Sequence, residues 1–253
     1  MTDTLVLGAG AAGLMCAIAA ARRGRRVTVL ERSNKPGKKI LMSGGGRCNF
    51  TNLHVSPERY LSANPHFCKS ALARYTQWDF IDCIERSGIE YFEKETVNGL
   101  SGQLFCHGSS KQVVAMLLDD CRRLGVELRL NCETTAVDRD GGVFTVSTST
   151  GDLRADSLVV ATGGLSIPSL GGSAFGYEHY LQIGIGHDAA VFQAGVEMGA
   201  RQHRRTAAAQ RQRRYGFGIF PVDLAGVDID TQNLSVGCAH QHDFPVVNLG
   251  RRQ

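Results

Sequence analysis

The sequence lacks the cysteine spacing, the long apolar segments and the leader that several classes of protein require. Its eight cysteines include no C-x-x-C pair, which speaks against a structural zinc site or a thioredoxin-type dithiol, and we expect free thiols and no metal. Glycine and arginine interrupt every apolar run before it reaches the roughly 18 to 20 residues that span a bilayer. The first residues also lack the basic and apolar regions of a secretory signal. We therefore expect a cytoplasmic protein without a membrane partner.

The sequence has little excess charge of either sign. Lys and Arg number 28 against 24 Asp and Glu, which gives +4, and this excess does not by itself indicate a nucleic-acid or membrane partner. Arginine is concentrated in RQHRRTAAAQRQRR at residues 201–214. Because no aromatic residue is interleaved there, the cluster is poorly suited to stacking on bases. We expect a solvated tail and no nucleic-acid partner.

Glycine is abundant. The chain has 30 glycines among its 253 residues, which is well above the roughly 7% of residues that glycine makes up in an average chain. Gly8, Gly10 and Gly13 form G-x-G-x-x-G between a strand expected at residues 4–7 and a helix expected at 11–23. In this motif the first glycine permits a tight turn, the second lets a pyrophosphate approach the backbone, and the third lets the helix pack closely on the strand. The helix N-terminus offers free amides to the phosphates.

A second strand is expected at residues 27–30, after Gly24 ends the helix. Strand, helix and strand then form a βαβ unit of about thirty residues. Glu31 follows the second strand, 18 residues beyond Gly13, where its carboxylate can accept hydrogen bonds from ribose hydroxyls. This context favours dinucleotide binding over an ordinary glycine-rich turn.

The segment KPGKKILMSGGGRCNFTN at residues 35–52 predicts an irregular loop. The glycines at 44–46 expose backbone amides that can form an anion-binding nest, Arg47 can neutralise a phosphate, and Asn49 can hydrogen-bond a ring carbonyl or nitrogen. A flexible surface loop is the alternative. Cys48 has no resolving cysteine nearby in sequence, so we do not expect a redox or covalent role for it.

The middle of the chain predicts helices. Residues 64–87 have aromatic and aliphatic side chains at mostly helical spacing, and we expect these side chains in the core. They are Phe67, Leu72, Tyr75, Trp78, Phe80, Ile81 and Ile84. Another helix is expected from Ser109 or Ser110, either of which can cap it, to about Leu124. Its apolar stripe consists of Val113, Val114, Leu117, Leu118 and Cys121.

Strands are expected in the next part. A strand at 126–130 precedes short strands at 134–137, 143–149 and 151–154, which predict a small antiparallel meander. A buried strand at 157–161 then leads to Thr162, Gly163 and Gly164. This second glycine turn would lie at the carboxyl end of a parallel sheet, where open α/β sheets bind ligands. The fold class is therefore α/β, with a parallel sheet and a small antiparallel meander.

These segments resemble the YhiN/BaiN-like flavoproteins, also labelled the aminoacetone oxidase family, which are NAD(P)/FAD-dependent oxidoreductases. The resemblance rests on GAGAAG at 8–13, KPGKKILMSGGGRCNFTN at 35–52, NPHFCKSALARYTQWDFID at 64–82, GQLFCHGSSKQVV at 102–114, and ATGGLSIP with FGY between 161 and 177. It implies a Rossmann-like FAD fold of the two-dinucleotide-binding-domain type. It also implies FAD as the cofactor, flavin redox chemistry, and a nicotinamide, NAD(P)H, as a candidate electron donor.

The resemblance further implies which residues hold FAD. They are Gly8, Gly10, Ala11, Ala12, Gly13, Glu31, Arg32, Lys39, Ser43, Gly44, Gly45, Gly46, Arg47, Cys48, Asn49, Thr134, Ala161, Thr162, Gly163 and Gly164. Thr134 is expected to offer its backbone to the adenine. NAD as the principal ligand of the first motif fits less well, because the SGGGRCN loop and the ATGG turn together match a flavin site. No acid, base or nucleophile is assigned, and His107 is expected at the surface.

The resemblance covers about residues 1–180. We therefore expect an FAD-binding domain at 1–183 and a non-homologous Arg-, Gln- and His-rich tail, poorly ordered, at 184–253. A changed reading frame near 184–186 explains this tail, and a genuine variant whose tail binds nucleic acid or another partner is the alternative. Family members continue through a substrate domain, so we expect weaker FAD binding and little or no turnover.

Two functions remain open at this point. One is an FAD-dependent oxidoreductase with a small-molecule substrate, and the other is a truncated or frame-shifted, non-catalytic nucleotide-binding remnant. Tight flavin binding would favour the first, and an empty site or poor folding would favour the second. The sequence specifies neither the substrate nor the oligomeric state.

Overall fold

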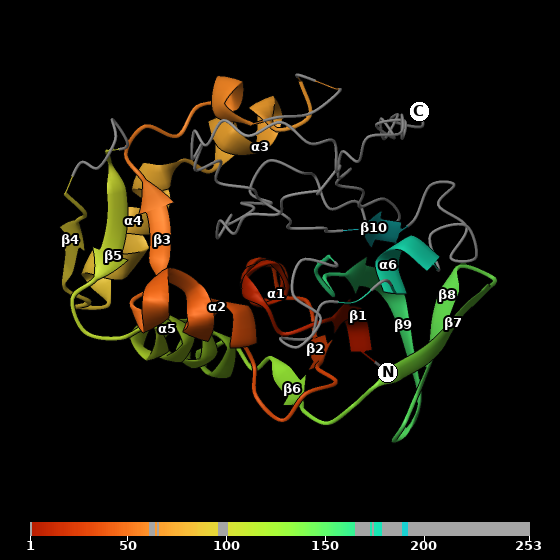
Figure 1. The fold of residues 1–253 in the computed structure, drawn as a ribbon. Helices are drawn as coiled ribbons and strands as arrows, with labels where there is room; N and C mark the ends of the chain where they lie inside the picture. The colour runs from red at the N-terminus through yellow and green to blue at the C-terminus, as the bar shows by residue number, and fades with distance from the viewer. Residues whose placement is uncertain are drawn as a thin grey trace, which may run out of the picture.

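The computed structural model describes residues 2–60, 64, 66–95, 101–164, 173, 175–178 and 189–191. These residues form a large mixed sheet, a small antiparallel sheet, and helices packed against both (Figure 1). The α/β fold class expected from the sequence is confirmed. The predicted tail at 184–253 lies outside the described residues, except for three residues in strand β10.

The large sheet has the strand order β6-β2-β1-β9-β8-β7, with β10 also paired to β9. Its strands are β1 (Thr2–Leu7), β2 (Val27–Leu30), β6 (Glu127–Arg129), β7 (Thr134–Asp140), β8 (Val143–Thr148), β9 (Gly151–Val160) and β10 (Ala189–Val191). β6, β2, β1, β9 and β10 run parallel, whereas β7, β8 and β9 form an antiparallel meander. The carboxyl ends of β1, β2 and β9 therefore meet at one edge of the sheet.

β9 connects the parallel part of the sheet with the meander. Its residues 151–155 pair with β8, and its residues 155–160 pair with β1. The sequence predicted two strands here, at 151–154 and 157–161, and this was wrong because one strand runs through both. The alternation of buried and exposed residues in its first half changes to continuous burial near its end, as expected where a strand enters a sheet covered on both faces.

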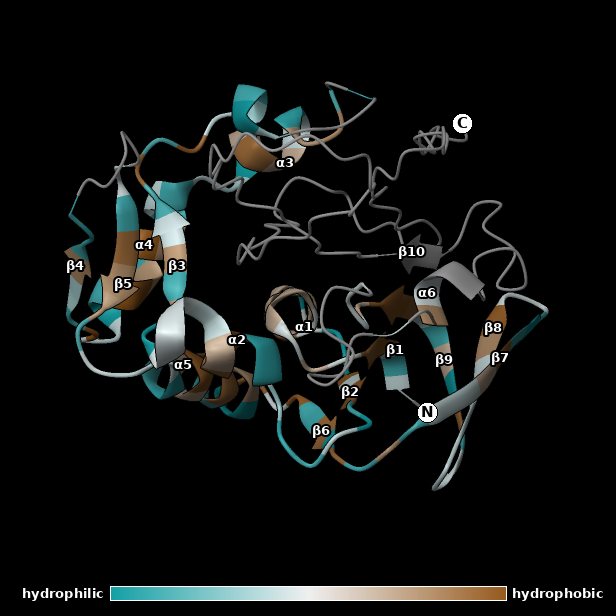
Figure 2. Ribbon diagram, viewed as in Figure 1, coloured by the Kyte–Doolittle hydropathy of each residue, from teal (hydrophilic) through white to brown (hydrophobic). Residues whose placement is uncertain are grey.

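The first helix, α1 (Ala11–Arg22), packs against the sheet along most of its length. Small residues allow this close approach, and eight of its twelve residues are buried. In Figure 2 the hydrophobic colour marks the carboxyl ends of β1 and β9, where both strands are buried. The βαβ unit predicted at the N-terminus is confirmed, and Gly24 follows the helix with a positive φ.

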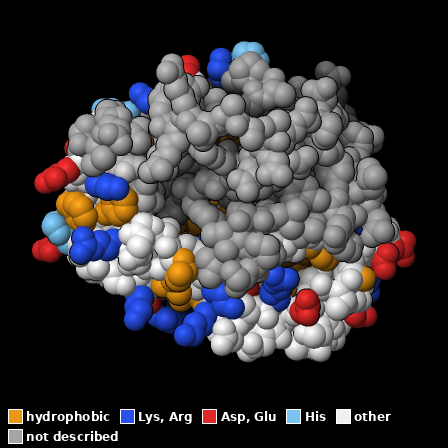
Figure 3. All heavy atoms as spheres, in the orientation of Figure 1, with side chains coloured by type: hydrophobic (Ala, Val, Ile, Leu, Met, Phe, Trp, Pro, Cys, Tyr) orange, Lys and Arg blue, Asp and Glu red, His pale blue; other side chains and the backbone are white. Residues whose placement is uncertain are grey.

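The small sheet has the order β3-β5-β4 and is entirely antiparallel. Its strands are β3 (Asn49–Asn52), β4 (Tyr91–Glu93) and β5 (Gln103–Cys106), and the helices α3 (Lys69–Arg74) and α4 (Gln77–Arg86) lie between β3 and β4 in the chain. At the left of Figure 3, over β4 and β5, hydrophobic side chains lie among Lys, Arg and His, with acidic residues at the rim. The sequence did not predict this sheet, because each strand has only three or four residues.

The segment at residues 35–52 was predicted to be irregular, and this was wrong. It contains the helix α2 (Lys38–Met42), a 3-10 turn (Ser43–Gly46) and β3. The three glycines of the turn have positive φ values of 57°, 65° and 87°. The sequence did not reveal these three elements, because each is too short to show a hydrophobic period.

The core expected from residues 64–87 is confirmed in part. Phe80, Ile81 and Ile84 of α4 are buried, but Trp78 is 57% exposed. Trp78 lies in the first turn of α4 beside its capping box of Thr76 and Asp79, on the side that faces away from the buried stripe. A 3-10 turn (Pro57–Arg59) and the short helix α6 (Phe175–Glu178) are also described.

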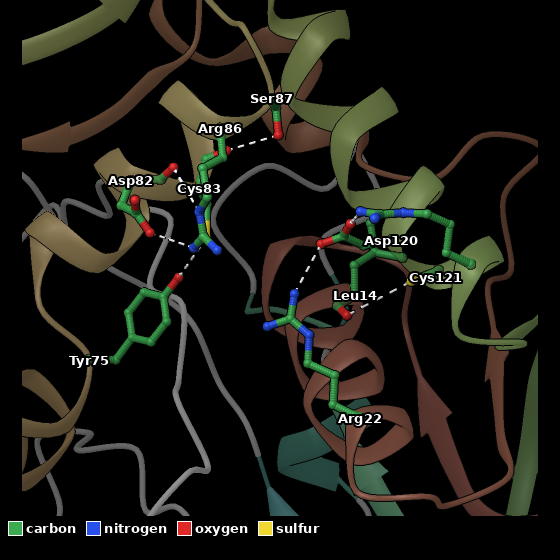
Figure 4. A network of polar contacts seen from close by, with 10 residues as sticks. Leu14, Arg22, Tyr75, Asp82, Cys83, Arg86, Ser87, Asp120 and Cys121 are labelled. Atoms are coloured by element: carbon green, nitrogen blue, oxygen red, sulfur yellow. Dashed lines mark hydrogen bonds and ion pairs between the residues drawn. The ribbon is translucent and has the colours of Figure 1, made fainter.

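The helix α5 (Ser110–Arg123) covers α1. Ser109 caps it and Gln112 completes a capping box, so the predicted start is confirmed. Figure 4 shows Cys121 of α5 pointing to the carbonyl of Leu14, and Asp120 pairing with Arg22 at 3.3 Å. Exposed pairs of this kind stabilise by only about 0.2–1 kcal/mol, so buried residues such as Leu117 provide most of the contact.

Within the described residues no helix is long and apolar enough to span a membrane.

Candidate functional site

The first glycine turn lies at the carboxyl end of β1, in contact with the end of β9. A Cβ atom on Gly8 would lie 2.5 Å from the carbonyl oxygen of Ala161, and one on Gly13 would collide with the carbonyl oxygen of Gly8. Gly8 also has a φ of 103° and donates its N–H to the Leu30 carbonyl at 2.7 Å. These two glycines are therefore required by the backbone packing itself.

Gly10 differs from its two neighbours in the motif. A Cβ atom there would meet no atom of the described residues within 4 Å, so their packing does not explain the glycine. Gly10 is the N-cap of α1, has no side chain with which to cap it, and precedes a first turn without acidic residues. The first amides of a helix have no intrahelical acceptor. Those of Ala11 and Ala12 are therefore suited to a phosphate that approaches across Gly10.

The carboxylate of Glu31 is fixed beside this turn. One oxygen accepts the backbone N–H of Ala9 at 2.9 Å, and the other accepts the N–H of Ser33 at 2.9 Å and its hydroxyl at 2.7 Å. A carboxylate has about four acceptor positions, so Glu31 retains capacity for a ligand hydroxyl. The structure thus brings Glu31 to the glycine turn, as the sequence predicted, and the ribose contact stays a prediction.

The sequence did not identify Ala9 and Ser33 as parts of this arrangement. The backbone amide of Ala9 gives no signal of its own, because any residue except proline supplies one. Ser33 was recognisable in principle, since serine two residues after an acidic residue often closes a local side-chain turn. Both hold the Glu31 carboxylate in one orientation.

The second glycine turn, at residues 161–164, lies against the first. Ala161 donates its N–H to the Leu7 carbonyl at 2.8 Å, and Gly163 has a φ of 74°. The hydroxyl of Thr162 is buried and has no hydrogen-bond partner among the described residues. A buried hydroxyl without a partner costs about 1–3 kcal/mol, so Thr162 is suited to bond a ligand at this turn.

Lys39 of α2 reaches the same turn. Its Nζ donates to the Gly164 carbonyl at 3.2 Å and lies 3.1 Å from where a Cβ of Gly163 would stand. Burial and, to a smaller extent, the nearby guanidinium of Arg32 lower the pKa of Lys39 below its usual value. Arg32 is itself exposed. Lys39 and Arg32 therefore add positive charge beside the two glycine turns.

The SGGGRCN segment leads from α2 to the small sheet. Ser43 donates its hydroxyl to the Ile40 carbonyl at 2.8 Å, and a Cβ on Gly44 would approach the Phe105 ring to 2.7 Å. The exposed guanidinium of Arg47 lies 6.0 Å from the centre of the Phe92 ring. Asn49 begins β3 and pairs with Phe105 of β5. Arg47 thus contacts the small sheet, Asn49 belongs to it, and the predicted contacts of both residues with FAD stay predictions.

Gly45 and Gly46 lie in the same segment, and fewer atoms surround them than surround Gly44. A Cβ atom on either would meet no atom of the described residues within 4 Å. Both have a positive φ, so the turn itself requires glycine there. Their predicted contact with FAD stays a prediction.

Cys48 is inaccessible within this segment. Its side chain is fully buried, its φ is 53°, and burial raises the pKa of its thiol to about 12. A thiol with such a pKa has almost no thiolate at neutral pH, and the thiolate is the reactive form. Cys48 therefore fills space under the loop, and both the absence of a redox role and its contact with FAD stay predictions.

Thr134 begins β7 and is half-buried. Two residues before it, Cys132 donates its N–H to the Glu31 carbonyl at 3.0 Å, which brings this stretch next to the end of β2. The predicted backbone contact of Thr134 with an adenine stays a prediction. His107 follows β5 and is exposed, as expected, and no group of three metal-ligating side chains occurs in the described part of the chain.

The comparisons with known proteins agree with this geometry. Residues 2–219 match the family described as "HI0933-like protein Rossmann domain", and this range includes both glycine turns. The chain is 52% identical over 183 residues to a ribosomal RNA dihydrouridine synthase of Escherichia coli K12, covering 72% of this chain and 44% of that protein. It is 49% identical over 188 residues to the Haemophilus influenzae protein of the same name, covering 73% and 46%.

A more distant relative has a different name. The chain is 29% identical over 208 residues to a 3-dehydro-bile acid delta(4,6)-reductase of Clostridium scindens, covering 81% of this chain and 49% of that protein. The chain therefore spans less than half the length of each of these three relatives.

Proposed function

The chain belongs to the HI0933-like family of Rossmann-domain proteins, and from this premise we propose that it forms the FAD-binding part of a flavin-dependent reductase that converts uridine to dihydrouridine in ribosomal RNA. The single observation that supports the cofactor assignment is the convergence of two glycine turns, Glu31 and the buried Thr162 hydroxyl at one edge of the sheet. The RNA substrate rests on the relatives named for it.

The residues at this edge fit FAD in four respects. The space at Gly10 and the amides of Ala11 and Ala12 suit the pyrophosphate. The Glu31 carboxylate suits the ribose hydroxyls, and the positive charge of Lys39 suits an anionic ligand. The Thr162 hydroxyl, which has no partner among the described residues, can bond the ligand.

Bound FAD, once reduced by NAD(P)H, would supply a hydride equivalent, and the protein would supply position and electrostatics. In dihydrouridine formation one hydride and one proton add across the C5–C6 double bond of uracil. NAD(P)H is the proposed electron source, and it is oxidised to NAD(P)⁺ as uridine is reduced. The two names among the relatives share this chemistry, because each describes reduction of a carbon–carbon double bond.

The proposal goes beyond the sequence-based expectation in one respect. The small net charge gave no reason to expect a nucleic-acid partner, and the RNA assignment follows the relatives instead. It selects the oxidoreductase from the two functions left open, and the non-catalytic remnant becomes the contrary outcome of the test.

The test is an assay on ribosomal RNA purified from cells that lack their own dihydrouridine synthase for it. The chain is incubated with FAD, NADPH and this RNA, and the nucleosides are quantified by mass spectrometry after nuclease digestion. The sequence alone led us to expect little or no turnover, whereas the proposed function predicts that dihydrouridine appears with NADPH and is absent without it. Flavin binding without any dihydrouridine would contradict the substrate and leave the cofactor assignment intact.

A further inference from the structure

The two faces of the small sheet differ in chemistry. The inner face is apolar and belongs to the core, since Phe50, Leu104 and Cys106 are buried and the Phe50 ring lies 6.1 Å from that of Phe80 on α4. Side chains alternate between faces along a strand. The outer face therefore presents the residues between the buried ones, among them Phe105 and the exposed His107 that follows it.

Aromatic rings line this outer face. Phe92 and Phe105 are register partners on adjacent strands, and their rings are stacked with centres 6.0 Å apart and planes 28° apart. The ring of His107 lies 4.9 Å from that of Phe92. Both phenylalanines are half-buried, so part of each ring is accessible to a partner.

Cations border these rings. The Arg47 guanidinium lies 6.0 Å from the centre of Phe92, and the Lys94 ammonium lies 5.8 Å from the centre of Phe105. The adjacent carboxylate of Glu93 is engaged elsewhere, because it accepts the N–H of Gly102 at 2.7 Å. The aromatic face is the name used below for five residues joined by these contacts: Arg47, Phe92, Lys94, Phe105 and His107.

One short segment of chain connects the aromatic face with the candidate flavin site. Lys39, at one end of the connecting segment, contacts Gly164 in the second glycine turn. Gly44, a few residues later, lies against Phe105, and Asn49 pairs with Phe105 across the strands. A polymeric substrate bound on the aromatic face would thus follow one short segment of chain toward the glycine turns.

We propose that the aromatic face binds a single-stranded segment of the RNA substrate, with bases stacked on Phe92 and Phe105 and phosphates attracted by Lys94 and Arg47. This proposal rests on the proposed function, and it specifies where the RNA is held. Aromatic rings bind bases of any sequence by stacking, and neighbouring cations neutralise the backbone. Phe92 and Phe105, each with a cationic side chain near its ring, provide both the stacking surface and the positive charge.

The first test measures affinity for a fluorescein-labelled single-stranded oligouridine by anisotropy, at fixed salt. Replacing Phe92 by Leu keeps an apolar side chain and removes the stacking surface, and we expect affinity to fall about 5- to 100-fold. Phe92→Tyr keeps the ring and should bind like the parent. Trp78→Leu, which removes an exposed aromatic from α4, is the matched control and should leave affinity unchanged.

The second measurement is the salt dependence of the same binding. Each phosphate that the protein no longer neutralises on a single strand lowers the slope of log affinity against log salt by about 0.7. Lys94→Gln should therefore reduce the slope by this amount, whereas Lys69→Gln, at an exposed lysine of α3, should not. Retention of the thermal transition in Phe92→Leu shows that the variant is folded.

The outcomes separate this proposal from the proposed function. The aromatic face is not an RNA site if Phe92→Leu binds the oligouridine as tightly as the parent does. The same conclusion follows if the parent itself does not bind the oligouridine. A change of oligomeric state in Phe92→Leu with unchanged RNA affinity would indicate a protein contact there and overturn it too. The proposed function fails independently, when the parent forms no dihydrouridine although it binds RNA.

Discussion

The carboxylate of Glu31, at the end of β2, accepts a hydrogen bond from the backbone N–H of Ala9, inside the glycine turn that follows β1, at 2.9 Å. The same carboxylate accepts two hydrogen bonds from Ser33. One acidic side chain therefore connects the two parallel strands at the edge where the candidate site lies. It fixes the turn before any ligand arrives, and a preformed site avoids part of the ordering cost of binding.

Glu31→Gln tests this connection. The amide can no longer accept at both oxygens, so at least one charge-assisted hydrogen bond cannot form, and we expect a free energy of unfolding lower by about 1–3 kcal/mol. FAD affinity should fall about tenfold or more. Urea unfolding and fluorescence titration with FAD measure the two effects. Glu133→Gln, at an exposed residue, is the control, and equal effects in both variants would contradict the role of Glu31.

Gly10→Ala and Gly13→Ala distinguish a glycine that leaves room for the ligand from a glycine that the packing of the backbone requires. A methyl group at position 10 meets no atom of the described residues, so the free energy of unfolding should stay within about 1 kcal/mol of the parent while FAD binding weakens more than tenfold. A methyl group at position 13 collides with the Gly8 carbonyl, so we expect a loss of about 3 kcal/mol or an insoluble product. Normal FAD binding by Gly10→Ala would show that the pyrophosphate does not approach this position.

Thr162 offers a test with effects of opposite sign. Thr162→Val removes a buried hydroxyl that has no partner among the described residues, so the protein without ligand should be as stable as the parent or up to about 2 kcal/mol more stable. Its FAD affinity should nevertheless fall about 2- to 10-fold. Thr162→Ser keeps the hydroxyl and should bind FAD like the parent. Loss of stability together with unchanged affinity in Thr162→Val would show that the hydroxyl is structural.

Cys48 should resist thiol reagents in the folded protein. Burial raises the pKa of its thiol from 9.0 to about 12, so the thiolate fraction at pH 8 is lowered about 1000-fold. The reaction should accelerate about tenfold with each pH unit up to about pH 12, provided that the fold persists. Iodoacetamide labelling followed by peptide mass spectrometry measures this, with the half-buried Cys83 as the internal comparison. Rapid labelling of Cys48 at pH 8 in a folded sample would contradict its burial.

The sequence predicted those strands and helices whose ends are marked by glycine or by a capping residue. Gly8 and Gly13 stand where backbone packing requires glycine, and Ser109 caps α5 with its partner Gln112, so these boundaries could be placed closely. The continuity of β9 could not be predicted, because its first half alternates and its second half does not. The local sequence pattern predicted an element correctly where the burial of its residues follows one pattern along its whole length.

The candidate site was predicted unevenly for a physical reason. Residues on the large sheet, such as Glu31 and Thr162, come together because the carboxyl ends of parallel strands meet. Arg47 lies against the small sheet and Asn49 belongs to it, and their expected contact with FAD stays a prediction. That sheet pairs strands far apart in the chain, and no single-sequence pattern shows such pairings. The aromatic contacts of Phe92 and Phe105 follow from the same pairing.

The most direct test of the account is whether the two glycine turns together hold FAD. The purified chain is incubated with excess FAD, separated from free cofactor, and examined by its absorbance spectrum and by chromatography of the cofactor released on denaturation. The account predicts flavin bands at equimolar amount with FAD released, and their loss in Gly10→Ala but not in Trp78→Leu. A chain that unfolds cooperatively, and is therefore folded, yet retains no flavin from saturating FAD would contradict the central claim.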